Sequence, residues 1–314
     1  MAAIDSGPVS RPSRASHARS SSLAISTPAG PRTSASGASS MPSPIAGVGG
    51  DERLSRDALV GVSAQRMEGA SAQQVSETLA AEVPVAMQYN ARPHAVMMAT
   101  PSNLADFAYG FALTERIVAS VAELTLADTL WTEHGVALEM LIPQQRFLLL
   151  QNRERNLTGR TGCGLCGTAT LAAAIRPVRK VDPTGPRADV AALRAGMLRL
   201  AAQQPLNDAS GAVHAAALLT TDGGFTVRED VGRHNAIDKA VGAVMRAGQV
   251  PHTLLVTSRA SYEVVHKAAE VGCRLVAAIS APTALALRLA QEAGVTLVGW
   301  TRPPRLTVYC GQLT

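Results

Sequence analysis

The C-terminal part of the chain alternates short apolar runs with longer stretches of helical periodicity. The strand-like runs are 253–257, 274–279 and 295–299, and the helix-like stretches are 234–246, 262–271 and 283–293. Strands that alternate with helices of this length predict βαβ units and a largely parallel sheet covered by helices on both faces. Ligands of such sheets collect at the carboxyl ends of the strands. The polar turns that follow these strands are therefore the first candidates for a binding site.

The preceding part of the chain is also of α/β type. We predict strands at 83–89, 94–99, 136–142, 146–151, 213–219 and 225–227, and helices at 104–118, 168–175 and 189–203. Asp222-Gly223-Gly224 is typical of a hairpin turn between the last two of these strands. The folded domain is expected at 82–314, and 53–81 is a poorly defined lead-in.

The first 52 residues have a different composition. Ser, Ala, Pro, Gly and Arg dominate, and no apolar periodicity is present. Such a segment cannot bury enough apolar surface to offset the entropy of ordering, so we expect a disordered extension. Its arginines resemble those of a transit peptide, but they follow no amphipathic rhythm, which favours a simple low-complexity extension.

Charge and composition exclude several partners. The formal net charge is +5, but the first fifty residues hold four arginines and one acid, which leaves 25 basic and 23 acidic residues elsewhere. Aromatic residues make up only 3% of the chain, so the stacking platforms of nucleic-acid binders are missing. No apolar stretch is long enough for a membrane span or a signal peptide. We expect a cytoplasmic protein that binds neither nucleic acid nor membrane.

A glycine-rich loop at 159–168 contains two of the four cysteines, Cys163 and Cys166. The glycines leave little bulk around the sulfur atoms, and the helix predicted after the loop directs its positive end towards them. Lowering a thiol pKa by about two units from its usual value near 8.5 makes roughly three quarters of it thiolate at neutral pH. The loop is therefore a candidate for cysteine chemistry.

A Cys-x-x-Cys pair alone has three readings: half of a metal site, a redox or sulfur-handling pair, or a structural pair. Cys273 and Cys310 are isolated from each other in the sequence and do not complete a zinc site, so we expect them to be buried as small hydrophobic residues. A thioredoxin-like pair usually opens a helix directly, whereas Gly164 and Gly167 place this pair on a loop. These arguments favour sulfur handling.

Four polar segments follow predicted strands. They are the cluster 228–239, the turns 257–261 and 280–283, and the cationic stretch 300–305. The cluster contains seven titratable side chains, which favours a constructed pocket over one helix cap among solvated charges. The two turns present hydroxyl and N–H groups at helix starts, where they can either cap the helix or bind an anion. Arg302 and Arg305 can grip phosphate from a proline-stiffened turn, or belong to an ordinary surface turn. His214 lies in an apolar run and is expected in the core.

Several familiar signatures are missing. The chain has no Gly-x-Gly-x-x-Gly before a helix and no Walker-type phosphate loop. The His-x-Glu motif of zinc deaminases does not occur, and no nucleophile elbow is present.

Four motifs, in this order, resemble the FdhD family of formate dehydrogenase accessory sulfurtransferases. They are GCGLCG at 162–167, REDVGRHNAIDK at 228–239, SRASYE at 258–263 and SAPT at 280–283. The resemblance implies a cytidine-deaminase-like α/β fold, with a mixed sheet and helices on both faces, but without the deaminase zinc site. It implies a homodimer that takes sulfur from a cysteine desulfurase. The acceptor it implies is the molybdenum cofactor, Mo-bis(molybdopterin guanine dinucleotide), before this cofactor enters formate dehydrogenase.

The resemblance also implies residue roles. Cys163 matches the persulfide-forming cysteine, and Cys166 is its neighbour in relay or resolution. The residues implied to line the cofactor site with its guanine nucleotide are Asp230, Arg233, His234, Asn235, Ser258, Arg259, Ser261, Trp300, Thr301, Arg302, Pro303, Pro304 and Arg305. The family often has glycine where this chain has Pro303-Pro304. No structural metal is expected. A non-catalytic cofactor chaperone and a deaminase-type zinc hydrolase are the alternative functions.

Overall fold

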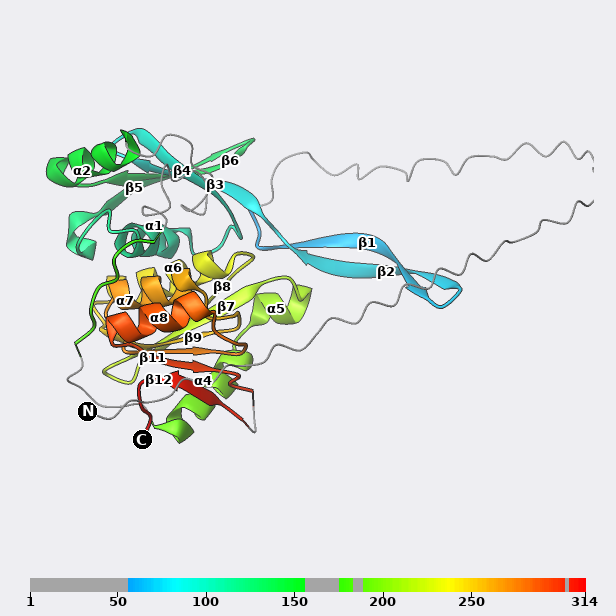
Figure 1. Ribbon diagram of the computed structural model, residues 1–314. Helices are drawn as coiled ribbons and strands as arrows, with labels where there is room; N and C mark the ends of the chain where they lie inside the picture. The colour runs from blue at the N-terminus through cyan, green and yellow to red at the C-terminus, as the bar shows by residue number, and fades with distance from the viewer. Residues whose placement is uncertain (1–55, 156–174, 183–188, 303–304) are drawn as a thin grey trace, which may run out of the picture. The chain divides into compact units, whose positions relative to one another are not determined.

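The computed structural model describes residues 56–155, 175–182, 189–302 and 305–314 (Figure 1). The extension predicted at 1–52, the cysteine loop with its following helix at 168–174, and Pro303 and Pro304 lie outside the described residues. All the elements below belong to one compact unit, Asp51–Thr314.

The larger sheet has six strands in the order β12-β11-β10-β9-β7-β8. Their bounds are β7 His214–Thr220, β8 Phe225–Asp230, β9 Pro251–Val256, β10 Leu275–Ala278, β11 Thr296–Gly299 and β12 Thr307–Cys310. Only β9, β10 and β11 pair in parallel, while β7, β8 and β12 pair antiparallel to their neighbours. The sheet is thus mixed, which confirms the mixed sheet that the family resemblance implies, whereas the largely parallel sheet predicted from the alternation of strands and helices was wrong. The β7–β8 hairpin and the returning strand β12 account for the difference.

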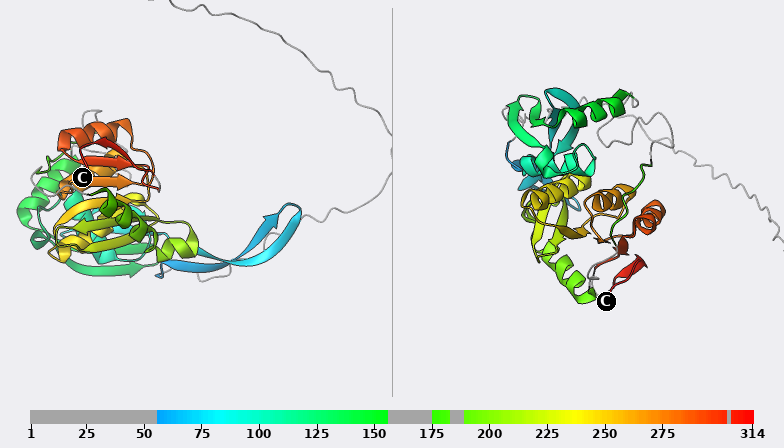
Figure 2. Two further views of the ribbon diagram at one scale, coloured as in Figure 1. Left: turned by 90° about the horizontal axis from the view of Figure 1, so that it is seen from below. Right: turned by 90° about the vertical axis from the view of Figure 1, so that its left-hand side faces the viewer.

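Helices cover both faces of this sheet (Figures 1 and 2). Their bounds are α4 Val190–Ala201, α6 Arg233–Arg246, α7 Tyr262–Glu270 and α8 Ala284–Ala293. Neighbouring residues of one strand point to opposite faces: Leu254 belongs to the core beneath α6, α7 and α8, whereas Leu255 packs with Leu193 and Met197 of α4. A strand buried on both faces must be apolar at every position, which explains the continuous apolar runs in the sequence.

A second sheet has four strands in the order β4-β3-β6-β5. Its strands are β3 Val83–Tyr89, β4 Arg92–Ala99, β5 Thr125–Thr132 and β6 Gly135–Leu141, and a short 3₁₀ helix, η1 Val121–Glu123, precedes β5. The β3–β4 turn consists of Asn90 and Ala91, both with positive φ (50° and 62°), as a two-residue hairpin turn requires. The family resemblance implies one mixed sheet, and the structure has this second, smaller sheet in addition to it.

Helix α1, Leu104–Thr114, packs between the smaller sheet and α6 (Figures 1 and 2). The two helices approach closely at Gly110 and Gly242. A Cβ atom on Gly110 would lie 1.7 Å from the Asp238 carbonyl oxygen, and one on Gly242 would lie 1.8 Å from that of Asp106. These two glycines are required by the close helix crossing.

Residues 146–151 form part of helix α2, Gln144–Arg155, so the strand predicted there was wrong. The apolar run Phe147-Leu148-Leu149-Leu150 reads as a buried strand, but Leu148 and Leu149 are about half exposed and only Leu150 is fully buried. The inward side chains, Phe147 and Leu150, are spaced three residues apart, which is the helical period. Pro143 stands just before the helix, where proline is tolerated.

The lead-in at 53–81 contains an antiparallel hairpin, β1 Leu59–Glu68 and β2 Ser71–Ala80, which the sequence did not predict. Its outer half is exposed on both faces, so it lacks the clean apolar alternation of a half-buried strand. The short helix α5, Pro205–Ser210, contacts this hairpin. Among the described residues, no helix is both long and apolar enough to cross a bilayer.

Candidate functional site

The polar turns predicted from the sequence meet at one edge of the larger sheet. Because β9, β10 and β11 are parallel, their carboxyl ends lie at the same edge. Asp230 ends β8 opposite His214, the first residue of β7, so β8 also ends there. The turns are joined by backbone hydrogen bonds: Thr283 N–H donates to Ala260 O at 3.0 Å, and Trp300 N–H donates to Ser280 O at 3.3 Å. We call this edge the turn edge.

Two of the predicted cofactor residues, Asp230 and Asn235, are engaged inside the protein. The Asp230 carboxylate is fully buried, 2.6 Å from Lys239 Nζ, and it accepts hydrogen bonds from Thr100 N–H and from Asn235 Nδ2. Asn235 Nδ2 also donates to the Met98 carbonyl oxygen. These contacts attach the start of α6 to the loop before α1. The side chains of Asp230 and Asn235 therefore shape the turn edge from within.

Arg233 and His234, by contrast, are only partly buried. His234 Nε2 has no hydrogen-bond partner among the described residues and lies 3.7 Å from Glu263 Oε2. Burial lowers the pKa of His234 to about 4, and the charges of Lys267 and Arg233 act in the same direction. His234 is therefore neutral at pH 7, and its Nε2 is buried below the surface of the turn edge.

His214 was predicted in the core but is only half-buried at the turn edge. Its pKa is lowered by burial and by the charge of Arg233. This histidine is a member of the site that the sequence did not identify. His214 is the first residue of one hairpin strand and lies opposite Asp230, the last residue of the other. This position could have identified it from the sequence.

The turns after β9 and β11 combine inward hydroxyls with outward arginines. Ser258 Oγ donates to the Arg259 carbonyl oxygen at 3.0 Å, and Ser261 Oγ donates to Glu263 Oε2 at 2.8 Å. Buried Thr301 donates from Oγ1 to the Ala278 carbonyl oxygen. The hydroxyls predicted as ligand contacts are thus occupied by local bonds.

The outward side chains of these turns are cationic. Arg259, Arg302 and Arg305 are exposed, and the guanidinium of Arg305 lies 4.9 Å from the centre of the Trp300 ring. Trp300 has a positive φ of 55°, which is uncommon for a bulky residue and turns the chain sharply after β11. Helices α6, α7 and α8 begin at the same edge, with their positive ends towards it. This combination fits a ligand with several phosphate groups.

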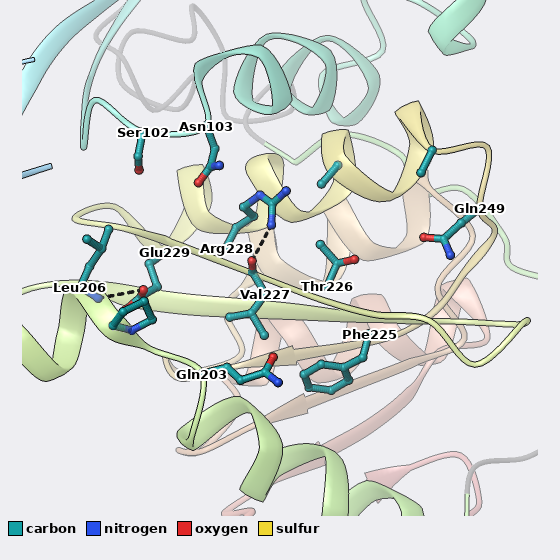
Figure 3. A pocket seen from close by; sticks show the side chains of 13 residues that line it. Ser102, Asn103, Gln203, Leu206, Phe225, Thr226, Val227, Arg228, Glu229 and Gln249 are labelled. Atoms are coloured by element: carbon teal, nitrogen blue, oxygen red, sulfur yellow. Dashed lines mark hydrogen bonds between the residues drawn. The ribbon is translucent and has the colours of Figure 1, made fainter. Parts of the chain in front are cut away.

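A pocket of about 710 Å³ lies elsewhere, along the outer edge of β8 (Figure 3). Side chains from the loop before α1, from α6 and from the segment between α4 and α5 surround it. Its best-defined polar group, Glu229, accepts the N–H groups of Leu206 and Asn207 at the start of α5, and burial raises the pKa of this carboxyl. Arg228 and Glu229 of the predicted cluster 228–239 line this pocket, whereas none of the residues implied for the cofactor site does.

A buried charge network joins α1, α6 and α7. Lys267 Nζ lies 2.9 Å from both carboxylate oxygens of Asp238 and 3.0 Å from Glu115 Oε1, and it donates to Thr114 Oγ1. Burial would raise the pKa of Glu115, but Lys267 and Arg176 together hold it far below its usual range. This network could not be predicted from the sequence, because its members are distant from one another in the chain.

The described residues on either side of the cysteine loop contact the end of α1. Arg153 precedes the loop and Arg176 follows it, and both contact Glu115. The backbone N–H of Arg176 also donates to the Tyr262 hydroxyl at 2.8 Å. Tyr262 is the first residue of α7, which begins at the turn edge. Arg176, which follows the loop in the chain, is thereby linked to the helix that borders the predicted cofactor site.

Of the two remaining cysteines, both predicted to be buried, Cys273 is buried and Cys310 is only partly buried. Cys273 is fully buried, and burial raises its pKa to about 12, so it is a poor nucleophile. Cys310 is half-buried, donates to the Val295 carbonyl oxygen, and also has a raised pKa. Within the described part of the chain, no group of three or more His, Cys, Asp or Glu residues is arranged to hold a metal ion.

Comparison with known proteins agrees with this architecture. The FdhD/NarQ family model matches residues 80–313. Proteins named sulfur carrier protein FdhD from Cupriavidus necator and Xanthomonas euvesicatoria are both 47% identical, over 74% and 78% of this chain and 82% and 88% of their own.

A solved structure has a similar fold. It is the crystal structure of a proposed formate dehydrogenase accessory protein from Desulfotalea psychrophila, with a TM-score of 0.60. The match covers 81% of this chain and 97% of that chain at 21% identity. Taken with the ordered motifs and the observed mixed sheet, these matches show that the chain belongs to the FdhD/NarQ family.

Proposed function

We propose that this protein is a sulfur carrier that transfers sulfur to the molybdenum cofactor of formate dehydrogenase. The relatives named sulfur carrier protein FdhD support the sulfur-transfer role. The structural observation that supports the proposal is the bond from Arg176 N–H to the Tyr262 hydroxyl, because it links the chain that follows the cysteine loop to the helix that starts at the turn edge. A sulfur carrier must bring its thiol to the acceptor, and this link is compatible with that requirement.

The proposed chemistry begins with Cys163. Its thiolate attacks the outer sulfur of a persulfide on a cysteine desulfurase, the donor cysteine leaves as a thiol, and Cys163 becomes a persulfide. The donor is reduced as Cys163 is oxidised, so no external oxidant is needed. At the acceptor, Cys166 then attacks the inner sulfur, forms a disulfide with Cys163 and releases the outer sulfur as hydrosulfide to the molybdenum. A dithiol reductant then cleaves this disulfide and restores both thiols for the next cycle. This assigns a catalytic role to Cys163 and a resolving role to Cys166.

The acceptor we propose is Mo-bis(molybdopterin guanine dinucleotide), bound as a substrate at the turn edge. Its pyrophosphate groups would pair with Arg233, Arg259, Arg302 and Arg305, since arginine recognises phosphate with two parallel hydrogen bonds. The helix N-termini supply further N–H donors. Asp230, Asn235, Ser258, Ser261 and Thr301 would support this site from below through the bonds described above.

The remaining parts of the proposal concern partners and location. We propose a cysteine desulfurase as sulfur donor, formate dehydrogenase as recipient, a homodimer as the working form, and the cytoplasm as its compartment. The alternative is a chaperone that binds the cofactor at the same edge without using its thiols.

The two functions differ in their need for Cys163. In a strain lacking its own copy of this protein, the Cys163→Ala variant should yield inactive formate dehydrogenase, while the wild-type protein restores activity. Full activity with Cys163→Ala would overturn the sulfur-carrier proposal in favour of the chaperone. Zinc bound to Cys163 and Cys166, detected by elemental analysis, would instead indicate a hydrolase of the deaminase type.

A further inference from the structure

The residues on both sides of the cysteine-containing segment 156–174 contact the same point of the protein, the C-terminal end of α1. On the N-terminal side, Arg153 of α2 donates from Nη1 to the carbonyl oxygens of Glu115 and Arg116, at 3.3 and 3.2 Å. These are carbonyl groups at the end of a helix, where cations are favoured by the helix dipole. The segment therefore starts from a helix that is attached to the end of α1.

On the C-terminal side the contacts are more numerous. Arg176 Nη1 lies 2.9 Å from Glu115 Oε2, and Arg116 Nη2 donates to the Pro177 carbonyl oxygen at 3.0 Å. The Arg176 backbone is held by Tyr262, as described above. The described residues on both sides of the segment therefore contact Glu115 and Arg116 at the C-terminal end of α1.

The end of α1 is itself firmly held. Arg116 has a positive φ of 56° and pairs through two nitrogen atoms with the buried carboxylate of Glu270 in α7. Glu115 is bound on its other oxygen by Lys267, which is buried against Asp238. A strained backbone residue persists only where its surroundings determine it, and here two ion pairs from α7 do so.

We propose that Glu115 and Arg116 are positioning residues that hold both ends of the 156–174 segment against α7, and that this anchoring sets the efficiency of sulfur delivery. The proposal rests on the sulfur-carrier function proposed above. Cys163 is eight residues beyond Arg155, so it can reach at most roughly 28 Å from the last residue of α2. Of these contacts, the one from Arg176 to Tyr262 involves the first residue of α7, at the turn edge. Held ends limit how far the thiol can move from the anchor, and we expect this to raise its effective concentration at the turn edge.

This role predicts a separation between loading and delivery. Accepting sulfur from a desulfurase requires only an accessible thiolate, whereas delivery requires the thiol to be confined near the bound cofactor. We therefore expect the double variant Arg153→Ala/Arg176→Ala to acquire the persulfide at a rate within twofold of the wild type. Its delivery, measured as formate dehydrogenase activity per persulfide-loaded protein, should fall at least tenfold. Arg176→Lys, which keeps the charge facing Glu115, should recover part of the loss.

The matched control is Arg146→Ala. This arginine lies on the same helix α2 and pairs with Glu123 through two nitrogen atoms, but it contacts neither Glu115 nor Arg116. Its loading and delivery should both equal those of the wild type. Unchanged delivery in the double variant, or loading that falls in parallel with delivery, would overturn the positioning role.

A second measurement keeps this test separate from the sulfur-carrier proposal. Amide hydrogen exchange at residues 175, 176 and 178 reports the anchoring without any sulfur chemistry, and it should accelerate at least tenfold in Arg176→Ala but not in Arg146→Ala. If the wild-type protein takes up no sulfur, the proposed function fails, yet this exchange result still decides whether the anchor exists. Equal exchange in both variants would overturn the anchor.

Discussion

Lys267 lies 2.9 Å from both carboxylate oxygens of Asp238, in a position where neither side chain is more than 7% exposed. Asp238 belongs to α6 and Lys267 to α7, so the pair joins two helices that begin at the turn edge. Asp238 and Glu115 raise the pKa of Lys267 against the opposing effect of burial. The ion pair is therefore a structural centre beneath the proposed site.

Removing the cation should destabilise the protein strongly. In Lys267→Met, the carboxylates of Asp238 and Glu115 remain buried without this partner, and we expect a loss of about 3 to 5 kcal/mol in the free energy of unfolding. Urea unfolding measures this change. The exposed pair Arg66–Glu77 is the control, since Arg66→Ala should cost about 1 kcal/mol or less. A loss for Lys267→Met as small as that of Arg66→Ala would contradict this account.

Stability should fall as the pH drops from about 6.5 to 4. Burial lowers the pKa of His266 to about 4, with the charge of Arg176 acting in the same direction. The unfolded chain, with its ordinary histidine pKa, therefore binds a proton that the folded state excludes in this range. The contribution from His266 is present above pH 6.5 and is lost as the pH falls to about 4, amounting to roughly 3 kcal/mol.

Urea unfolding at pH 7, 5.5 and 4 tests this dependence. In His266→Gln the loss between pH 6.5 and 4 should shrink by about that amount, whereas His134→Gln, which changes an exposed ring, should leave it unaltered. An identical pH profile for His266→Gln and the wild type would show that His266 is not the group responsible.

The crossing of α1 and α6 should tolerate no side chain. Gly110→Ala places a methyl group into the backbone of Asp238, and because backbone cannot move away as a flexible side chain can, we expect a cost of about 3 kcal/mol or more. Gly61→Ala is a suitable control, since a Cβ there has no neighbour within 4 Å. The midpoints of urea unfolding should differ clearly between the two variants; equal midpoints would refute the close crossing.

The arginines of the turn edge should govern nucleotide affinity. A guanine nucleotide such as guanosine diphosphate contains part of the proposed cofactor. We expect Arg259→Ala and Arg302→Ala each to weaken its binding by about tenfold or more, because each removes charge-assisted hydrogen bonds to phosphate. Isothermal titration calorimetry measures the affinity. Arg288→Ala, an exposed arginine of α8 away from the helix start, should bind as the wild type does, and the same result for both edge variants would exclude this binding mode.

The sequence predicted much of the larger sheet and its turns, because strands buried on both faces have continuous apolar runs. It failed at 146–151, where four consecutive apolar residues fit a buried strand as well as a helix. Only packing shows that Leu148 and Leu149 are half exposed while Leu150 is buried. It also missed the β1–β2 hairpin, whose exposed strands show no regular alternation.

The sequence predicted where the polar turns lie in the fold, but not which way their side chains point. The strand ends identified the turn edge, since this follows from topology. The direction of each side chain did not follow from the sequence. Asp230 is held inside the protein by Lys239 and Thr100, and Asn235 is held by Asp230 and the Met98 carbonyl oxygen. Thr100 and Asp230 are 130 residues apart in the sequence, so local sequence patterns cannot reveal their contact.

The central claim is that Cys163 carries sulfur as a persulfide. Intact-protein mass spectrometry after incubation with a cysteine desulfurase and cysteine tests it most directly, with Cys163→Ala beside the wild type. The account predicts that the wild-type protein gains the mass of one sulfur atom, that reduction removes it, and that the variant gains nothing. A folded wild-type protein that gains no sulfur, or a variant that gains as much, would contradict it.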